Sequence, residues 1–105
     1  MRRNVWPTDA PTGEVDVAEP YKDIGERLEK IRKAYGLSQS EFARRINVKP
    51  HTFNGWLTGK KRPSVDTALD IRKEFHAGLD YLYAGDTSTL PVKLEYAIRY
   101  GKKLT

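Results

Sequence analysis

The sequence contains no cysteine, only one methionine and no long hydrophobic run. Without cysteine, the chain has no disulfides, no thiolate zinc sites and no cysteine nucleophile. Uncharged stretches such as residues 34–40 are far shorter than the ~20 apolar residues that a membrane-spanning helix needs. The arginine pair near the start is not followed by an apolar segment, so no export signal is expected. We therefore predict a cytoplasmic protein without a membrane segment.

Signals for catalysis are also scarce. The two histidines, His51 and His76, have no acidic neighbours at the spacing of a metal site. There is no glycine-rich phosphate loop, and no serine lies in a nucleophile-elbow context. We expect no enzymatic activity, no catalytic residues, no metal and no cofactor. His76 is interpreted as a structural helix cap.

The positive charge is unevenly distributed along the chain. The formal net charge is +5, and residues 37–63 alone carry +5. Residues 64–86 carry −3, residues 87–105 carry +3 and residues 1–20 carry −2. A basic block of this kind, flanked by less basic segments, indicates a surface that contacts an acidic polymer.

The apolar residues after residue 20 recur with helical spacing. Ile24, Leu28, Ile31 and Tyr35 form one stripe that ends at Gly36, and no segment shows the alternation of a strand. The fold class predicted is therefore all-α: a compact bundle of five short helices with a C-terminal amphipathic helix. We predict a flexible N-terminal arm at 1–20, a helical domain at 21–86, and a linker with a basic amphipathic helix and tail at 87–105.

Local signals place the boundaries of the middle helices. "SQSE", residues 38–41, is a capping box that begins the second helix, and Asn47 suits the left-handed conformation of the turn that ends it. Pro50 suits the first turn of the third helix, and Ser64 is an N-cap for the fourth. In the fourth helix we expect an inward face made of Val65, Ala68, Leu69, Phe75 and the stem of Arg72.

The second and third helices, joined by a tight turn, form a helix-turn-helix. The stretch "LSQSEFARRINVKPHTFNGWLTGKKRPS", residues 37–64, resembles the phage Cro and lambda-repressor type (XRE-like) helix-turn-helix DNA-binding family. The resemblance lies in the Leu-Ser-Gln opening, an alanine in the second helix and the Gly-Lys…Arg-Pro-Ser ending. It covers roughly residues 24–85.

This resemblance implies a small phage- or bacterial-type regulator, a repressor, that binds double-stranded DNA sequence-specifically with its third helix in the major groove. It implies that the protein is nucleoid-associated and binds an inverted repeat as a homodimer. Base edges would be read at His51, Asn54 and Gly55. The expected contacts to the DNA backbone are made by Gln39, Lys49, Thr52, Lys60, Lys61 and Arg62.

The reading helix departs from the family pattern in two places. Pro50 and Gly55 stand where related repressors often carry a polar reader, and neither has a side chain that donates or accepts a hydrogen bond. Direct readout would therefore depend mainly on His51 and Asn54. Dimerisation, DNA shape, or Arg2 and Arg3 of the arm entering a minor groove would supply the remaining specificity.

The dimer surface and the partner are less defined by the sequence. We expect the dimer surface on residues 90–100, joined by Leu79, Tyr81 and Leu82 of the fifth helix, because their apolar residues exceed what five short helices need to cover. A protein-interaction or antitoxin-like module on the same fold, with a protein partner and secondary DNA binding, is the alternative function. A third is nucleoid binding without sequence preference.

Overall fold

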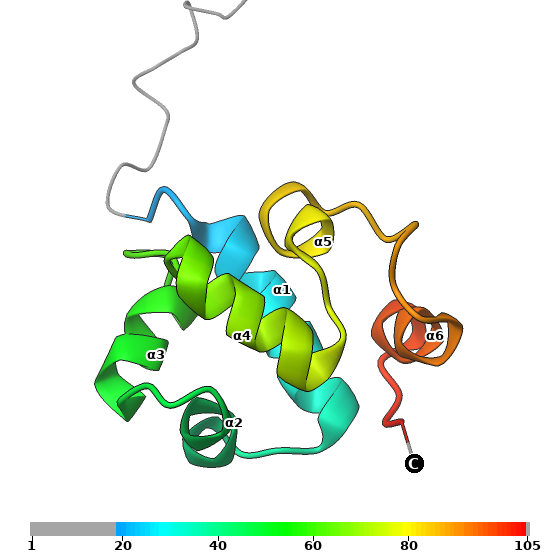
Figure 1. The fold of residues 1–105 in the computed structure, drawn as a ribbon, viewed down its shortest axis with the longest axis horizontal. Helices are drawn as coiled ribbons and strands as arrows, with labels where there is room; N and C mark the ends of the chain where they lie inside the picture. Colours follow the sequence, from blue (N-terminus) through cyan, green and yellow to red (C-terminus); the bar gives the residue numbers. More distant parts are fainter. Residues whose placement is uncertain (1–18, 105) are drawn as a thin grey trace, which may run out of the picture.

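The computed structural model describes residues 19–104, which form six α-helices and no β-strand (Figure 1). The helices are α1 (Lys22–Tyr35), α2 (Gln39–Arg45), α3 (Pro50–Leu57), α4 (Val65–Phe75), α5 (Leu79–Ala84) and α6 (Val92–Tyr100). The predicted all-helical fold is confirmed. Nearly all of the segment expected to form an N-terminal arm, including Arg2 and Arg3, lies outside the described residues.

The boundaries of the first three helices agree with the local signals in the sequence. Gly36 ends α1 in the left-handed conformation (φ 69°), and Asn47 adopts it after α2 (φ 59°). The capping box is formed: the Glu41 N–H donates to Ser38 Oγ at 3.1 Å, and the Ser38 N–H donates to Glu41 Oε1 at 2.8 Å. Pro50 occupies the first turn of α3. Each of these boundaries was predicted, because each depends on residues close together in the chain.

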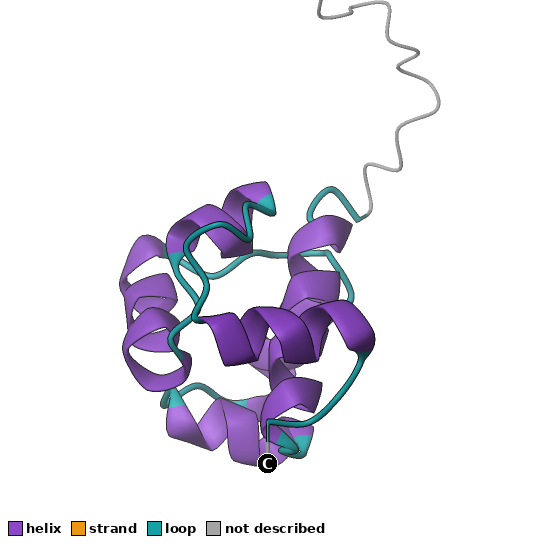
Figure 2. Cartoon of the chain, turned by 90° about the vertical axis from the view of Figure 1, so that its right-hand side faces the viewer, coloured by secondary structure: helices purple, strands orange, loops and turns teal. Residues whose placement is uncertain are grey.

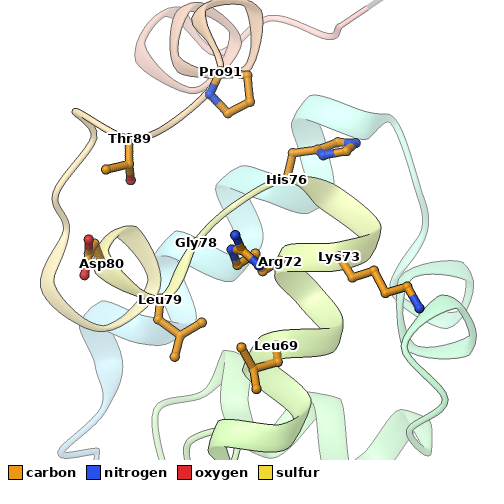
Figure 3. A pocket seen from close by; sticks show the side chains of 9 residues that line it. All are labelled: Leu69, Arg72, Lys73, His76, Gly78, Leu79, Asp80, Thr89 and Pro91. Atoms are coloured by element: carbon orange, nitrogen blue, oxygen red, sulfur yellow. The ribbon is translucent and has the colours of Figure 1, made fainter.

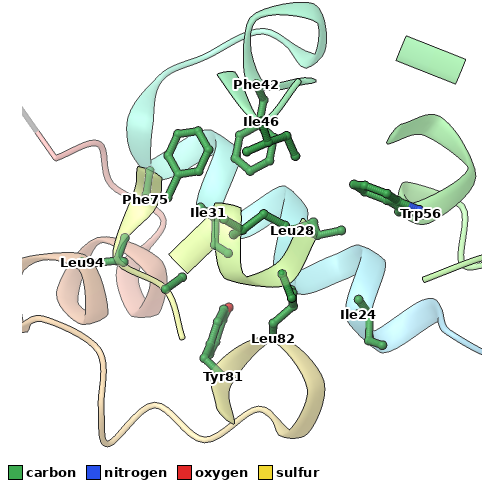
Figure 4. Close-up of a cluster of buried hydrophobic side chains, with 14 of the residues drawn as sticks. Ile24, Leu28, Ile31, Phe42, Ile46, Trp56, Phe75, Tyr81, Leu82 and Leu94 are labelled. Atoms are coloured by element: carbon green, nitrogen blue, oxygen red, sulfur yellow. The ribbon is translucent and has the colours of Figure 1, made fainter. Parts of the chain in front are cut away.

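The core is built around α1, which contacts α3, α5 and α6. Phe42 of α2 stacks on Phe53 and on Phe75, with ring centroids 5.0 and 4.3 Å apart. Tyr35 adds an edge-on contact to Phe75 and donates a hydrogen bond to its carbonyl oxygen at 2.6 Å. Figure 4 shows part of this core, with Phe42 and Phe75 beside Leu28 and Ile31 of α1. The aromatic cluster thus ties α2, α3 and α4 to the central helix.

The inward face of α4 differs from the prediction. Ala68 and Phe75 are buried as expected, and Ile71 is buried with them, but Val65 and Leu69 are 59% and 46% exposed. Arg72 is exposed as well. Pro63, just before α4, is fully buried, and the face of α4 that packs into the core is Ala68, Ile71 and Phe75, at i, i+3 and i+7.

The apolar stripe expected to form a dimer surface belongs mostly to the core. Leu90, Leu94 and Ala97 are at most 7% exposed, and α6 packs on α1. Tyr81 and Leu82 of α5 are buried as well. These buried side chains are therefore not available to a partner subunit, because α6 covers α1, which the sequence alone does not show. A dimer surface within residues 90–100 stays a prediction for the exposed side chains of that segment. The exposed apolar side chains of α6 are Val92, Tyr96 and Tyr100.

The helices α3 and α6 lie at opposite sides of the body. In Figure 1, α3 lies at the left and α6 at the right, and in Figure 2, which views the molecule from that right-hand side, α6 is nearest the viewer. α4 lies between them and begins directly after the loop that connects it to α3. Within residues 19–104, no helix is both long and apolar enough to cross a membrane.

Candidate nucleic-acid interface

The turn between α2 and α3 is fixed by backbone hydrogen bonds. The Asn47 N–H donates to the Arg44 carbonyl at 3.1 Å, and the Val48 N–H donates to the Ala43 carbonyl at 2.9 Å. The left-handed Asn47 allows the chain to reverse here within a few residues. The short turn and the stacked Phe42 and Phe53 rings hold α2 and α3 as one unit.

The inner face of α3 lies very close to α1. Phe53 and Trp56 are 1% and 5% exposed. A Cβ at Gly25 of α1 would lie only 2.5 Å from the Trp56 carbonyl oxygen and 2.6 Å from that of Leu57. Only glycine fits at this position, because the obstacle is backbone. The close approach fixes the depth and orientation of α3, so its outer face has a defined direction relative to the body.

The outer face of α3 brings together the residues predicted to read bases. His51, Asn54 and Gly55 stand at i, i+3 and i+4, which places them on one face of the helix. The side chains of His51 and Asn54 are exposed, and Gly55 is half-buried. Thr52 is half-buried at the edge of this face. The geometry therefore assembles a small polar surface at the front of α3.

Gly55 has no structural explanation inside the described chain. A Cβ added there would meet no atom within 4 Å, so packing does not require glycine. Its φ is not in the left-handed region either. Glycine inside a helix costs roughly 0.5–1 kcal/mol relative to alanine. At this position the surface of α3 therefore carries no side chain.

The basic loop after α3 is anchored to the body. The backbone N–H groups of Lys60 and Lys61 both donate to the Gly55 carbonyl at 3.1 Å. The Tyr21 N–H donates to the Gly59 carbonyl at 2.9 Å, which ties the loop to the start of α1. At its other end, the Tyr83 hydroxyl donates to the Pro63 carbonyl at 2.8 Å. The loop therefore presents its cationic side chains from a fixed backbone.

The tyrosine that holds this end of the loop is a stable donor. Burial raises the pKa of the Tyr83 hydroxyl above its ordinary value, so it stays protonated at neutral pH. Its hydroxyl also donates to the Ser64 carbonyl at 3.3 Å. The contact therefore does not depend on pH in the physiological range.

The cations beside α3 are available to a ligand. The side chains concerned, on both sides of the polar face, are Lys49, Lys60, Lys61 and Arg62. The three ion pairs found between residues 19 and 104 involve none of them. The guanidinium carbon of Arg62 lies 5.0 Å from the centroid of the Tyr21 ring, which steadies its stem while the side chain stays exposed. Gln39, the first residue of α2, is also exposed.

Two residues of this surface were missed by the sequence reasoning. Tyr21 supports Arg62 across 41 positions of sequence, and no local signal indicates such a contact. Arg44 lines a surface hollow with Asn47 and Lys49 at the turn between α2 and α3. Its place in the basic block and its position in the last turn of α2 would have identified it as a further cation beside α3.

Glu41, the acidic residue of the basic block, takes part in the capping box of α2. The hydrogen bond from the Ser38 backbone N–H holds the pKa of the Glu41 carboxyl below its ordinary value. Glu41 is therefore ionised at neutral pH and serves the start of α2. No cluster of three or more metal-ligating side chains occurs between residues 19 and 104. The arrangement fits the binding of a polyanion.

Comparisons with known proteins agree with this geometry. The family model described as "Helix-turn-helix" matches residues 28–82, more than half of the chain, from the middle of α1 to α5. The chain belongs to the XRE-like helix-turn-helix family.

Two curated relatives have names of the same kind. An uncharacterized HTH-type transcriptional regulator of Archaeoglobus fulgidus is 31% identical over 64 residues, covering 61% of this chain and 91% of the relative. The HTH-type transcriptional regulator ImmR of Bacillus subtilis is 27% identical over 63 residues, covering 60% of this chain and 50% of ImmR. No solved structure gives a significant match.

Proposed function

We propose that this protein is a small transcriptional repressor that binds double-stranded DNA sequence-specifically, with α3 in the major groove. The observation that carries the proposal is the polar outer face of α3, bordered by exposed cations on an anchored loop. Membership of the helix-turn-helix family and the names of the relatives support DNA-binding transcription regulation as the broader class.

Base readout would come from the front of α3. The major groove of B-DNA is ~12 Å wide and admits one helix. The exposed Asn54 amide suits a bidentate bond to adenine, which discriminates by about 1–3 kcal/mol. His51, one turn earlier on the same face, would donate to a guanine edge or accept from a cytosine amine. Gly55 would let the helix approach the groove closely, because no side chain separates its backbone from the duplex.

The phosphates would be held by the cations on both sides of this face. Lys60, Lys61 and Arg62 extend from the anchored loop, and Lys49 extends from the N-cap of α3. Gln39 and Thr52 would fix the register through phosphate contacts, as the family pattern implies. Each phosphate contact releases condensed counterions, so binding should weaken steeply as salt rises.

A homodimer on an inverted repeat would give the affinity that one short helix lacks. Two copies would place their α3 helices in successive major grooves, about 34–36 Å apart along the duplex. Occupation of such a site is the basis for repression. The protein would then be cytoplasmic and nucleoid-associated.

The test is selection from random duplex DNA followed by binding titrations at several salt concentrations. The proposal expects an enriched palindrome that binds ~10³-fold or more tighter than a scrambled duplex of the same length. Salt-sensitive binding without an enriched sequence would indicate nucleoid binding without sequence preference instead. An absence of binding at low salt would contradict both.

One observation favours a second function, a protein-interaction or antitoxin-like module. Val92, Tyr96 and Tyr100 of α6 are 85%, 55% and 56% exposed, and the two tyrosine rings lie 4.7 Å apart. Reversal of the charges at Lys60 and Arg62 separates the two functions. In a DNA-binding regulator it should abolish duplex binding, whereas a complex formed through α6 should be unaffected.

A further inference from the structure

The outward face of α4 carries a stripe of apolar and basic side chains beside a surface pocket. Val65 and Leu69 are 59% and 46% exposed, and with Arg72 and His76 they recur at i, i+4, i+7 and i+11. The pocket, of about 690 Å³, is lined by Leu69, Arg72 and His76 from this side and by Leu79 of α5 (Figure 3). Single exposed apolar residues need no explanation, but here Val65 and Leu69 lie one turn apart and Leu69 also lines the pocket.

Beside this stripe, α4 carries an acidic and a basic side chain that could each pair with the opposite charge on a second copy of the helix. Asp66 lies in the first turn of α4 and Lys73 in the last, seven residues apart on one flank of Leu69. Figure 3 shows Lys73 and Arg72 pointing to opposite sides of the helix, with Leu69 between them. The ion pairs formed within residues 19–104 involve neither Asp66 nor Lys73. An acid at one end and a base at the other match a copy of the same helix turned by 180°.

We propose that a second copy of this chain packs on α4, with the two α4 helices antiparallel about a two-fold axis near Leu69. A two-fold interface requires that each contact occurs twice, with residue i on j and j on i. About Leu69, Asp66 then lies opposite Lys73 of the partner subunit. Val65 lies against the stem of the partner's Arg72, at the edge of the pocket. The inference rests on the proposed function, because it specifies the dimer that reads the inverted repeat.

The place of α4 in the body explains why this face is chosen over α6. Although α6 exposes more apolar surface, it lies on the side of the molecule opposite α3 (Figure 1). Pairing through α6 would point the two α3 helices away from each other. α4 comes after α3 through the loop of residues 58–64, so pairing through α4 leaves the outer face of α3 uncovered and beside the interface. Of the two faces, α4 is therefore the one that suits two half-sites on one duplex.

The proposed α4–α4 interface is small, so we expect the dimer to form on DNA and not in dilute solution. A standard stable interface buries about 800 Å² on each partner, far more than two apolar side chains and one ion pair provide. The copies would therefore associate weakly in solution. Two half-sites on one duplex bring them together at an effective concentration on the order of mM, and the contact then appears as cooperativity.

The test compares duplexes with one and with two half-sites of the selected sequence, using the full chain. Leu69→Glu would place two like charges at the two-fold axis, while Val92→Glu adds the same charge on α6 as a matched control. Leu69→Glu should remove the gain in affinity from the second half-site, on the order of 5- to 150-fold, and leave single half-site binding unchanged. Val92→Glu should change neither. Cooperativity that survives Leu69→Glu, or disappears with Val92→Glu, would overturn the proposal.

A charge exchange tests the pairing itself. Asp66→Lys and Lys73→Asp alone should each reduce cooperativity, and the double variant should restore it, because the pair is then re-formed with reversed sign across the axis. Circular dichroism would confirm that all variants are folded. A double variant no better than the single ones would refute the Asp66–Lys73 contact.

Failure of the inference can be told apart from failure of the proposed function. Sedimentation equilibrium without DNA measures whether the 12.0 kDa chain doubles its mass at high concentration and whether Leu69→Glu prevents this. Self-association through Leu69 with no duplex binding would leave the interface standing and overturn the DNA-binding proposal. Specific but non-cooperative duplex binding would overturn the interface alone.

Discussion

The inner and outer faces of α3 differ in what an added side chain would meet. On the inner side, a Cβ at Gly25 of α1 would collide with the carbonyl oxygens of Trp56 and Leu57. On the outer side, a Cβ at Gly55 would meet nothing within 4 Å. Both glycines lie inside helices, where glycine is unfavourable. The fold requires the first glycine, whereas packing within the described chain does not require the second.

The comparison separates the residues that pack α3 against the body from the residues of α3 that would contact DNA. Phe53 and Trp56 belong to the first set, because they are buried against the central helix and the aromatic cluster. His51 and Asn54 belong to the second, because they are exposed at the front of the helix. Changes in the first set should alter stability, and changes in the second should alter DNA binding with little effect on folding.

The largest effect on the outer side is expected from the basic loop. Replacing Lys60 and Arg62 together by glutamine should weaken duplex binding by about 1.5–3 kcal/mol for each charged hydrogen bond to a phosphate that is removed. The dependence of log K on log salt should become less steep by about two, one for each phosphate. Folding should be nearly unchanged, because both side chains are exposed and the backbone of the loop keeps its hydrogen bonds.

A matched control lies on the far side of the molecule. Replacing Lys93 and Lys102 by glutamine removes the same charge from exposed positions in and just after α6. Titrations at several salt concentrations should show a much smaller reduction in affinity for this pair. Equal reductions for the two pairs would mean that net charge, and not the surface around α3, determines binding.

The next effect tests the inner side. Gly25→Ala should lower the free energy of unfolding by about 1–3 kcal/mol, because the new methyl group collides with backbone that has to move. Urea denaturation monitored by circular dichroism measures this change. An unchanged midpoint would show that α1 and α3 are not held as close as the structure places them.

Helix boundaries could be predicted from the sequence where they depend on residues close together in the chain. The capping box at Ser38, the left-handed Asn47 and Pro50 at the start of α3 each act within a few residues, and the predicted boundaries were right. The phase of α4 was predicted wrongly for Val65 and Leu69. Ile71 is buried in their place, and the segment before α4 is tied to Tyr83, 20 residues further along the chain, by a contact that a single sequence does not reveal.

The candidate site shows the same division. That His51, Asn54 and Gly55 share one face is a result of helical spacing alone, and the structure brings them together. The anchoring of the loop to Tyr21 depends on a contact between distant segments, which a single sequence does not reveal. The roles of these residues in reading bases and gripping phosphates remain predictions from the family resemblance.

On the outer side of α3, a glycine-to-alanine substitution should stabilise the fold, whereas Gly25→Ala should destabilise it. Gly55→Ala should raise the free energy of unfolding by about 0.5–1 kcal/mol, because alanine favours the helix and has room here. Duplex affinity should fall nevertheless, because the methyl group would stand between α3 and the groove. Parallel denaturation and binding titrations measure both. Higher stability with unchanged affinity would mean that Gly55 does not face the DNA.

The smallest effect is a pH dependence that belongs to the scaffold alone. Arg32 donates two hydrogen bonds to the Glu29 carboxylate, at 2.7 and 2.8 Å, and this contact lowers the pKa of Glu29 from its ordinary value of 4.5. Arg32 also donates to the Leu37 carbonyl at 2.7 Å, in the turn that leads to α2.

The sign of the effect is determined by this lowered pKa. The folded state holds the Glu29 proton less tightly than the unfolded chain does, so the contribution to stability is fully present above pH 4.5. It is lost as the pH falls through the lower pKa of the folded state. The free energy of unfolding, measured between neutral and acid pH, should be higher for wild type than for Glu29→Gln at neutral pH. The difference between the two proteins should vanish in acid. Because neither residue lies on the outer face of α3, duplex affinity at neutral pH should be the same for both proteins, and a lower affinity in Glu29→Gln would show that the scaffold and the reading face are not independent.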